Sequence, residues 1–180
     1  MHPGLQRVLF HERDIAARLD EMAAEITEFY QKKPLTVLAI LNGSLVFAAD
    51  LLRRIPLPLR FESLAVASYQ GTESSGIVSF RQSNLPAVSG RHVLLLDDIL
   101  DTGCTLNAVR QRILAEAAPL SIRAAVLLQK KKPRAETLVA DYAGFEIEDE
   151  FVVGYGLDFD GHYRNLPVVG VLNTSSLGLR

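Results

Sequence analysis

The stretch VLLLDDILDTGCT, residues 93–105, changes from an apolar run to a cluster of acids followed by a small polar loop. The acids are the pair Asp97-Asp98 and then Asp101, and the loop runs from Thr102 to Thr105. Backbone N–H groups of such a loop can bind a phosphate when a helix begins directly after it, and its glycine and hydroxyls assist. Alternatively, Asp101 and Thr102 only cap that helix. The loop alone leaves both interpretations open.

The acid pair Asp97-Asp98 needs a separate explanation, because a helix cap does not account for it. Like charges at the end of a buried strand repel each other and need hydroxyl groups, a cation or a nearby lysine as compensation. The hydroxyl groups of a ribose together with Mg²⁺ would supply that compensation. A phosphate on the loop and a diol against the carboxylates together describe a ribose 5-phosphate, so the stretch predicts a ribose-phosphate site.

The elements that must position this site alternate between helical and extended patterns. Apolar residues recur at helical spacing from Ile15 to Phe29, and Pro34 ends that helix. The same reasoning predicts helices in residues 45–55 and 105–118, and strands in residues 36–41, 60–69, 92–98, 121–130, 141–159 and 167–172. The segment IVSFRQ, residues 77–82, is interpreted as the second arm of a hairpin-like excursion. This order predicts an α/β fold: a single domain with a central, mainly parallel, twisted sheet flanked by helices.

Three polar stretches follow directly on apolar strand candidates, namely NGS from residue 42, DDILDTGCT from residue 97 and KKKPR from residue 130. In open α/β sheets, ligands bind beyond the carboxyl ends of the strands. We therefore expect the fold to bring these three stretches to one edge of the sheet.

Composition narrows the class of protein. The chain has 180 residues, of which 48% are hydrophobic, which suits one well-buried domain. A formal net charge of −2 gives no indication of a nucleic-acid or membrane partner. The single cysteine cannot form an internal disulfide, and the four histidines are too scattered for a zinc site. With no charged and apolar leader at the N-terminus, we expect a cytoplasmic protein.

The stretch at residues 93–105 resembles the signature of the type I phosphoribosyltransferases, which use 5-phosphoribosyl 1-diphosphate. More narrowly, the chain resembles the hypoxanthine-guanine phosphoribosyltransferases from about Leu35 to about Leu172, through LNGS, SYQGTESSG, LLQKKKPR and GFEIEDEFVVGYGLDFDGHYRNLP. The resemblance implies Mg²⁺-dependent conversion of hypoxanthine or guanine into IMP or GMP, with release of diphosphate. It also implies a homodimer or homotetramer, a core of about residues 35–130, and a small hood from about residues 1–15 and 131–180.

The resemblance assigns the ribose, phosphate and metal contacts. Asp97 and Asp98 match the pair that holds the ribose hydroxyls and Mg²⁺, and Asp101 matches a general base near N7 of the purine. The 5′-phosphate loop consists of Thr102, Gly103, Cys104 and Thr105. Diphosphate is expected on Asn42, Gly43 and Arg164, with a cis peptide between Leu41 and Asn42. A strand-to-helix turn capped by Asn42 or Ser44 is the alternative, and many relatives carry lysine or arginine where this chain has Asn42.

The resemblance also assigns the purine site. Lys130 matches a donor to O6 of a 6-oxopurine, Phe151 an aromatic ring that stacks on the base, and Val152 a source of backbone contacts. Periodicity alone would place Phe151 and Val152 in the core, and Lys131 and Lys132 are interpreted as a solvated basic turn. Asp158 matches a residue that meets both Mg²⁺ and the base edge, and Ser68 and Tyr69 begin a lid.

Two alternatives to the purine enzyme stay open at this point. A xanthine- or pyrimidine-preferring phosphoribosyltransferase would share the phosphate loop and differ in the hood, and Lys130 with FVVGYGLD argues against both. Related attenuators bind RNA on the same scaffold and would be expected to show a basic face. The acidic balance of this chain, with Asp101 at the base position, argues against that role.

Overall fold

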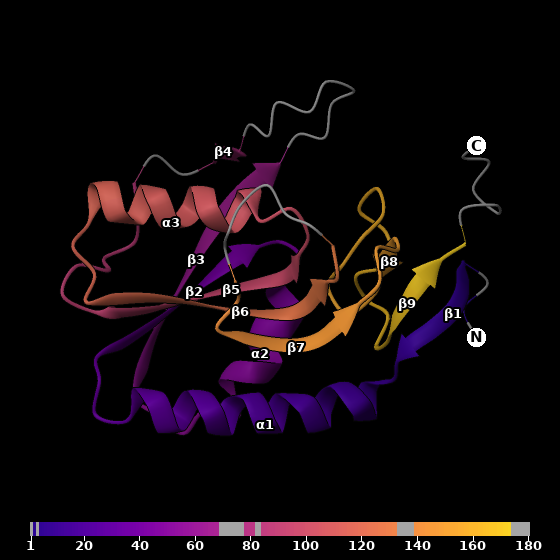
Figure 1. Ribbon diagram of the computed structural model, residues 1–180, viewed down its shortest axis with the longest axis horizontal. Coiled ribbons are helices and arrows are strands. Elements are labelled where there is room, and N and C mark those ends of the chain that lie inside the picture. Colours follow the sequence, from indigo (N-terminus) through magenta and orange to yellow (C-terminus); the bar gives the residue numbers. More distant parts are fainter. Residues whose placement is uncertain (1, 3, 69–77, 82–83, 133–138, 174–180) are drawn as a thin grey trace.

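The large sheet carries the strands that end in the three polar stretches. A computed structural model describes residues 2, 4–68, 78–81, 84–132 and 139–173 of the chain. In this part, six strands pair in the order β4-β3-β2-β5-β6-β7 (Figure 1). They are β2 (Leu35–Leu41), β3 (Leu59–Ser68), β4 (Val78–Phe80), β5 (His92–Leu100), β6 (Ser121–Lys130) and β7 (Tyr142–Ile147). All neighbours run parallel except β3 and β4, so the predicted hairpin-like return is confirmed.

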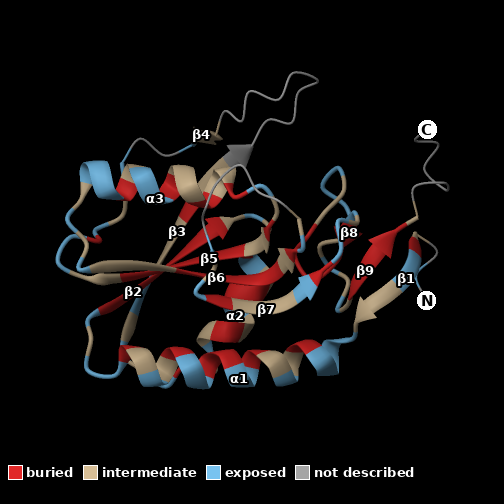
Figure 2. Cartoon of the chain, in the orientation of Figure 1, coloured by how far each residue is buried: buried red, intermediate tan, exposed pale blue. Residues whose placement is uncertain are grey.

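Helices cover both faces of this sheet. Helices α1 (Glu12–Tyr30) and α2 (Leu45–Leu52) lie on one face, and α3 (Cys104–Glu116) lies on the other (Figure 1). Alternate residues of β5 follow this division, because Leu94 and Leu96 join the core under α1 and α2 whereas Val93 and Leu95 join the core under α3. Burial on both faces explains why the strands are continuous apolar runs, which Figure 2 shows as buried sheet between partly exposed helices.

A smaller antiparallel sheet stands beyond the carboxyl ends of the large one (Figure 1). Its strands pair in the order β1-β9-β8, with β1 (Leu5–Phe10), β9 (Val169–Leu172) and β8 (Val152–Val153). Leu5, Val153 and Leu172 form its own small core. Strand β7 pairs with β6 in the large sheet, so of the described strands after residue 131 only β8 and β9 join β1 in the small sheet.

The α/β fold with a hood built from both ends of the chain is therefore confirmed. Within the described residues, no helix is both long and apolar enough to cross a membrane.

Candidate active site at the carboxyl edge of the large sheet

The acid pair lies near the end of β5 and is poorly compensated. Asp97 is buried, and its Oδ1 accepts a hydrogen bond from the Asp98 N–H at 3.1 Å, while Asp98 Oδ1 accepts one from the Ile99 N–H at 2.9 Å. Burial, and then the charge of Asp98, raise the pKa of the Asp97 carboxyl well above its usual range, and burial raises the pKa of Asp98. No lysine or arginine of the described segments forms an ion pair with either carboxylate. The pair would gain from hydroxyl donors or a cation.

The polar loop after β5 leads into α3, as the sequence predicts. Gly103 is the N-cap residue of this helix, and Thr102 Oγ1 accepts a hydrogen bond from the Cys104 N–H at 3.4 Å. The first turn of α3 carries no acidic residue, and a helix N-terminus favours a bound anion. The loop therefore leads directly into a helix N-terminus, as the phosphate interpretation requires.

Asp101 belongs to a cluster of two carboxylates and two ammonium groups. Lys130 Nζ lies 3.2 Å from Asp101 Oδ2 and 2.9 Å from Asp149 Oδ1. Lys132 Nζ contacts Asp101 Oδ1 and lies 3.2 Å from Asp149 Oδ1. The sequence predicts Lys130 and Asp101 in the site and Lys132 in a solvated turn, and it gives no indication of Asp149. The two-residue spacing of Lys130 and Lys132 at a strand end was the available signal, because such residues point to the same side.

The loop between β2 and α2 meets the acid pair directly. The peptide bond between Leu41 and Asn42 is cis, as the resemblance implied. A Cβ placed on Gly43 would lie 1.9 Å from Asp98 Oδ2, so only glycine fits between this loop and β5. The Ser44 hydroxyl donates to the Ile40 carbonyl at 2.6 Å and makes no hydrogen bond that caps α2. The alternative of a turn capped by the Ser44 side chain is therefore wrong.

The hood closes on the same loop from the other side. A Cβ on Gly156 would lie 2.2 Å from the Gly43 carbonyl oxygen, so the two backbones touch. Arg164 Nη1 donates to the Gly156 carbonyl at 2.6 Å, and its Nη2 lies 2.6 Å from Asp158 Oδ1. The Gly161 N–H donates to Asp158 Oδ2 at 2.7 Å. Arg164 and Asp158 are thus paired at the edge where Gly43 meets Asp98.

The remaining assigned residues lie at different depths. Phe151 is 48% exposed and packs edge-to-face on Phe159, so its placement in the core by periodicity is wrong, whereas Val152 is buried in β8. Ser68 is the last residue of β3, and the expected lid, apart from Ser68 itself, lies outside the described residues.

In the described part no three His, Cys, Asp or Glu side chains form a metal-binding group, so Asp97, Asp98 and Asp158 do not converge as a preformed set.

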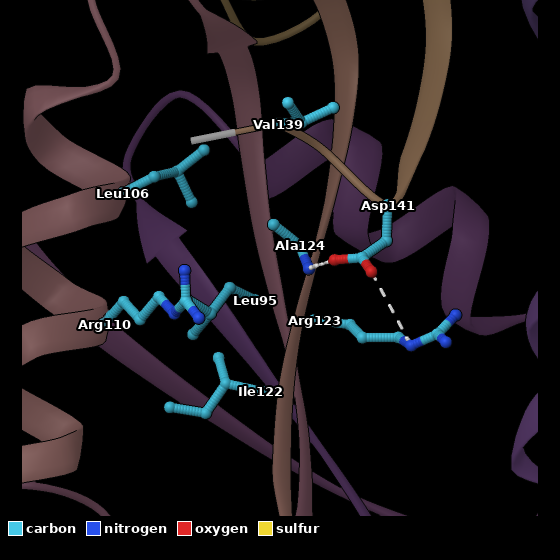
Figure 3. A pocket seen from close by; sticks show the side chains of 8 residues that line it. All are labelled: Leu95, Leu106, Arg110, Ile122, Arg123, Ala124, Val139 and Asp141. Carbon is cyan, nitrogen blue, oxygen red and sulfur yellow. Dashed lines mark hydrogen bonds and ion pairs between the residues drawn. The ribbon is translucent and has the colours of Figure 1, made fainter. Parts of the chain in front are cut away.

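A separate pocket of about 190 Å³ lies between α3 and the sheet (Figure 3). Arg110 points into it, while the guanidinium of Arg123 turns away toward Asp141, at 3.6 Å (Figure 3). Its lining is Leu95, Leu106, Arg110, Ile122, Arg123, Ala124, Val139 and Asp141. None of the residues assigned to the ribose, phosphate or purine contacts is among them.

Comparison with known proteins agrees with this architecture. The family model for the phosphoribosyl transferase domain matches residues 8–160. Hypoxanthine-guanine phosphoribosyltransferase of Staphylococcus aureus (strain Mu50) is 41% identical over 173 residues, 96% of each chain. Hypoxanthine-guanine-xanthine phosphoribosyltransferase of Tritrichomonas foetus is 38% identical over 176 residues, 97% of this chain and 96% of its own.

Solved structures extend the likeness to three dimensions. A hypoxanthine phosphoribosyltransferase from Staphylococcus aureus superimposes with a TM-score of 0.91 at 40% identity, covering 98% of this chain and 96% of its own. The enzyme from Trypanosoma cruzi, in complex with the product IMP, gives a TM-score of 0.88 at 34% identity, with 97% and 98% covered. An α/β sheet whose central strand ends in an acid pair, followed by a small polar loop and a helix, is the arrangement that this class shares with the chain. The chain belongs to the phosphoribosyltransferase family, and within it to the hypoxanthine-guanine phosphoribosyltransferases.

Proposed function

We propose that this chain is a purine salvage enzyme that transfers the 5-phosphoribosyl group of 5-phosphoribosyl 1-diphosphate to N9 of hypoxanthine or guanine. The products are IMP or GMP and diphosphate, and the reaction depends on Mg²⁺. The match to the relatives named above extends over nearly their full length. The enzyme acts in the cytoplasm as a homodimer or homotetramer.

The observation that carries the proposal is the placement of Lys130 beside Asp101. The Lys130 ammonium, a hydrogen-bond donor, lies 3.2 Å from the Asp101 carboxylate, an acceptor. A 6-oxopurine presents the complementary pair along one edge, with O6 as acceptor and N7–H as donor. Adenine presents an amino donor at C6, which would face the Lys130 ammonium. A site built around a buried donor rejects such a ligand strongly.

The other contacts follow the ligand away from the purine. Phe151, half-exposed at the hood, offers a ring face on which the base stacks. The loop at residues 102–105 holds the 5′-phosphate on backbone N–H groups, and Asp97 and Asp98 accept hydrogen bonds from the ribose hydroxyls. Diphosphate lies along Asn42 and Gly43, with Arg164 within reach of its oxygens.

Mg²⁺ fits the acid pair. Two carboxylates whose pKa values are raised by burial, and which have no ion pair among the described residues, are a favourable place for a hard divalent cation. Asp97 and Asp98 would hold the ion, with Asp158 of the hood as a further carboxylate. When bound, Mg²⁺ neutralises charge on the departing diphosphate.

The chemistry assigned to the protein is positioning and proton transfer. By accepting N7–H, Asp101 holds the purine as the tautomer whose N9 lone pair is available to attack C1′ of the ribose. As the N9–C1′ bond forms, positive charge develops on the imidazole ring, and the N7 proton moves to the Asp101 carboxylate. Such a general base contributes about 10²–10⁴-fold in rate. The lid beginning at Ser68 and Tyr69 would exclude water, which competes with the purine for C1′.

A steady-state assay tests the proposal. Hypoxanthine, guanine, xanthine, adenine and uracil are offered at saturating 5-phosphoribosyl 1-diphosphate and Mg²⁺, and nucleotide formation is followed. We expect turnover with hypoxanthine and guanine, none with adenine or uracil, and complete loss with a Mg²⁺ chelator. Turnover of adenine, a preference for uracil or metal-independent activity would contradict the proposal. Binding of structured RNA without any transferase activity would favour the RNA-binding alternative.

A further inference from the structure

Lys132 contacts the carboxylate of Asp101, which under the proposed function accepts the N7 proton of the purine. Its Nζ contacts Asp101 Oδ1, while Lys130 takes the other carboxylate oxygen, Oδ2, at 3.2 Å. The side chain of Lys132 is 24% exposed and that of Asp101 is 34% exposed, so the pair lies at the mouth of the site. The hydrogen bond with Asp101, ahead of that with Asp149, raises the pKa of Lys132, so this side chain is an ammonium at neutral pH.

A bound purine would affect the contacts of Lys130 and Lys132 differently. An ammonium carries three donors, so Lys130 can donate to O6 while it keeps its contacts with Asp101 and Asp149. Lys132 offers a donor to Asp101 Oδ1, as an N7–H would. A purine that presents N7–H must therefore compete with Lys132 for this oxygen.

A second carboxylate is already in place to receive Lys132. Its Nζ lies 3.2 Å from Asp149 Oδ1 and 3.4 Å from Asp149 Oδ2. Hydrogen bonds from Lys130 and then Lys132 lower the pKa of Asp149, so this acceptor is an anion at neutral pH. A small movement of one ammonium from Asp101 to Asp149 leaves the net charge of the cluster unchanged.

We propose that Lys132 is a positioning residue that occupies Asp101 in the ligand-free protein and transfers to Asp149 when a 6-oxopurine presents its N7–H. The proposal rests on the proposed function, because it takes Asp101 as the partner of N7. The proposal also predicts that Lys132 competes with the substrate and not with the product. In IMP, N7 is a lone pair without a proton, so the nucleotide has no donor that competes with Lys132 for Asp101.

The adjacent lysines offer a matched test. Lys132→Met removes the competing ammonium and keeps the length of the side chain. Lys131→Met removes the same charge one residue away, where Lys131 is half-exposed and its Nζ lies 3.6 Å from Glu148, outside the cluster. In each protein we would measure kcat, KM for hypoxanthine at saturating 5-phosphoribosyl 1-diphosphate, and Kd for IMP by equilibrium titration.

For Lys132→Met we expect the KM for hypoxanthine to fall about two- to five-fold, which is the effect of losing a partly exposed ion pair as a competitor. We expect kcat to stay within about two-fold of wild type, since Lys132 leaves Asp101 before the chemical step. The Kd for IMP should not fall. Lys131→Met should match wild type in all three quantities, and Lys132→Arg, which keeps the charge, should not lower KM.

Three results would overturn the inference: an unchanged or higher KM for hypoxanthine in Lys132→Met, an equal fall in Lys131→Met, or a parallel fall in the Kd for IMP. The last two would indicate a general effect of removing positive charge. Failure of the proposed function has a different signature, because wild type would then turn over neither hypoxanthine nor guanine. If wild type is active but Lys132→Met does not lower the KM for hypoxanthine without lowering the Kd for IMP, only the inference about Lys132 is wrong.

Discussion

Replacing Gly156 by alanine tests whether the hood fixes the loop between β2 and α2, to which we assign the diphosphate, through direct backbone contact. Gly156 has φ of +102°, and an added Cβ would lie 2.2 Å from the Gly43 carbonyl oxygen. Gly43 in turn lies against Asp98, because a Cβ on Gly43 would fall 1.9 Å from Asp98 Oδ2. A methyl group at position 156 must therefore push the loop toward β5 or lift the hood away from it.

The expected loss of folding free energy in Gly156→Ala has two contributions. A non-glycine residue in the left-handed region costs about 1–2 kcal/mol. Forcing a methyl group into a packed contact costs about another 1–3 kcal/mol. The sum is about 2–5 kcal/mol, which for a chain of this size lowers Tm by about 5–15 °C.

Gly90→Ala is the matched control, because Gly90 has φ of +69° and a Cβ there meets nothing within 4 Å. It carries the backbone cost without the contact, so we expect a loss of only about 1–2 kcal/mol. The change in unfolded-chain entropy is common to both variants and cancels in the comparison. Urea unfolding and thermal melts measure the difference, and steady-state kinetics should show a raised KM for 5-phosphoribosyl 1-diphosphate in Gly156→Ala only. Equal destabilisation of the two variants with unchanged kinetics would refute the contact argument.

Three further perturbations address charge. Asp97→Asn should raise Tm and abolish transfer. Burial and then Asp98 raise the pKa of Asp97, so the folded state binds the proton more tightly and wild type loses stability as pH rises above 3.8. This loss should be smaller in the variant, in which only Asp98 retains a carboxyl whose pKa is raised by burial. Burial raises the pKa of Asp50, but hydrogen bonds from Tyr155 and then Arg53 outweigh it and hold the pKa below its usual value. Tyr155→Phe should therefore cost about 1 kcal/mol at neutral pH and progressively less as pH falls below 3.8, as followed by urea unfolding across pH. Asp101→Asn should lower kcat by about 10²-fold or more, with a much smaller change in the Kd for IMP, and a variant as active as wild type would remove Asp101 from its assigned role.

The fold could be predicted largely because buried strands are recognisable in the sequence by their hydrophobic pattern. Strands covered on both faces are unbroken apolar runs, so the stretches at residues 36–41, 92–98 and 121–130 indicate β2, β5 and β6 within a few residues. Strand β1 has no such apolar run. It lies at the edge of the small sheet, where Leu5 pairs with Leu172 from the opposite end of the chain, and only one of its residues is buried. Its conformation follows from a partner that local sequence cannot specify.

The candidate site divides in the same way. Asp97, Asp98 and the loop after β5 could be predicted because one continuous stretch carries the strand end, the acids and the helix start. Asp149 could not, because it comes from a loop after another strand. Lys132 has only its two-residue spacing from Lys130 as a signal, and that signal is weak because a lysine beside other lysines is usually solvated. The close approach of Gly43 to Gly156 is also invisible in sequence, since a glycine in a loop is ordinarily explained by turn conformation. These tertiary contacts connect the hood to the sheet, and under the proposed function they fix the position of the purine site relative to the phosphate site. Substitutions among them should therefore alter the affinity for one substrate at a time, whereas substitutions in the stretch at residues 93–105 should impair transfer as a whole.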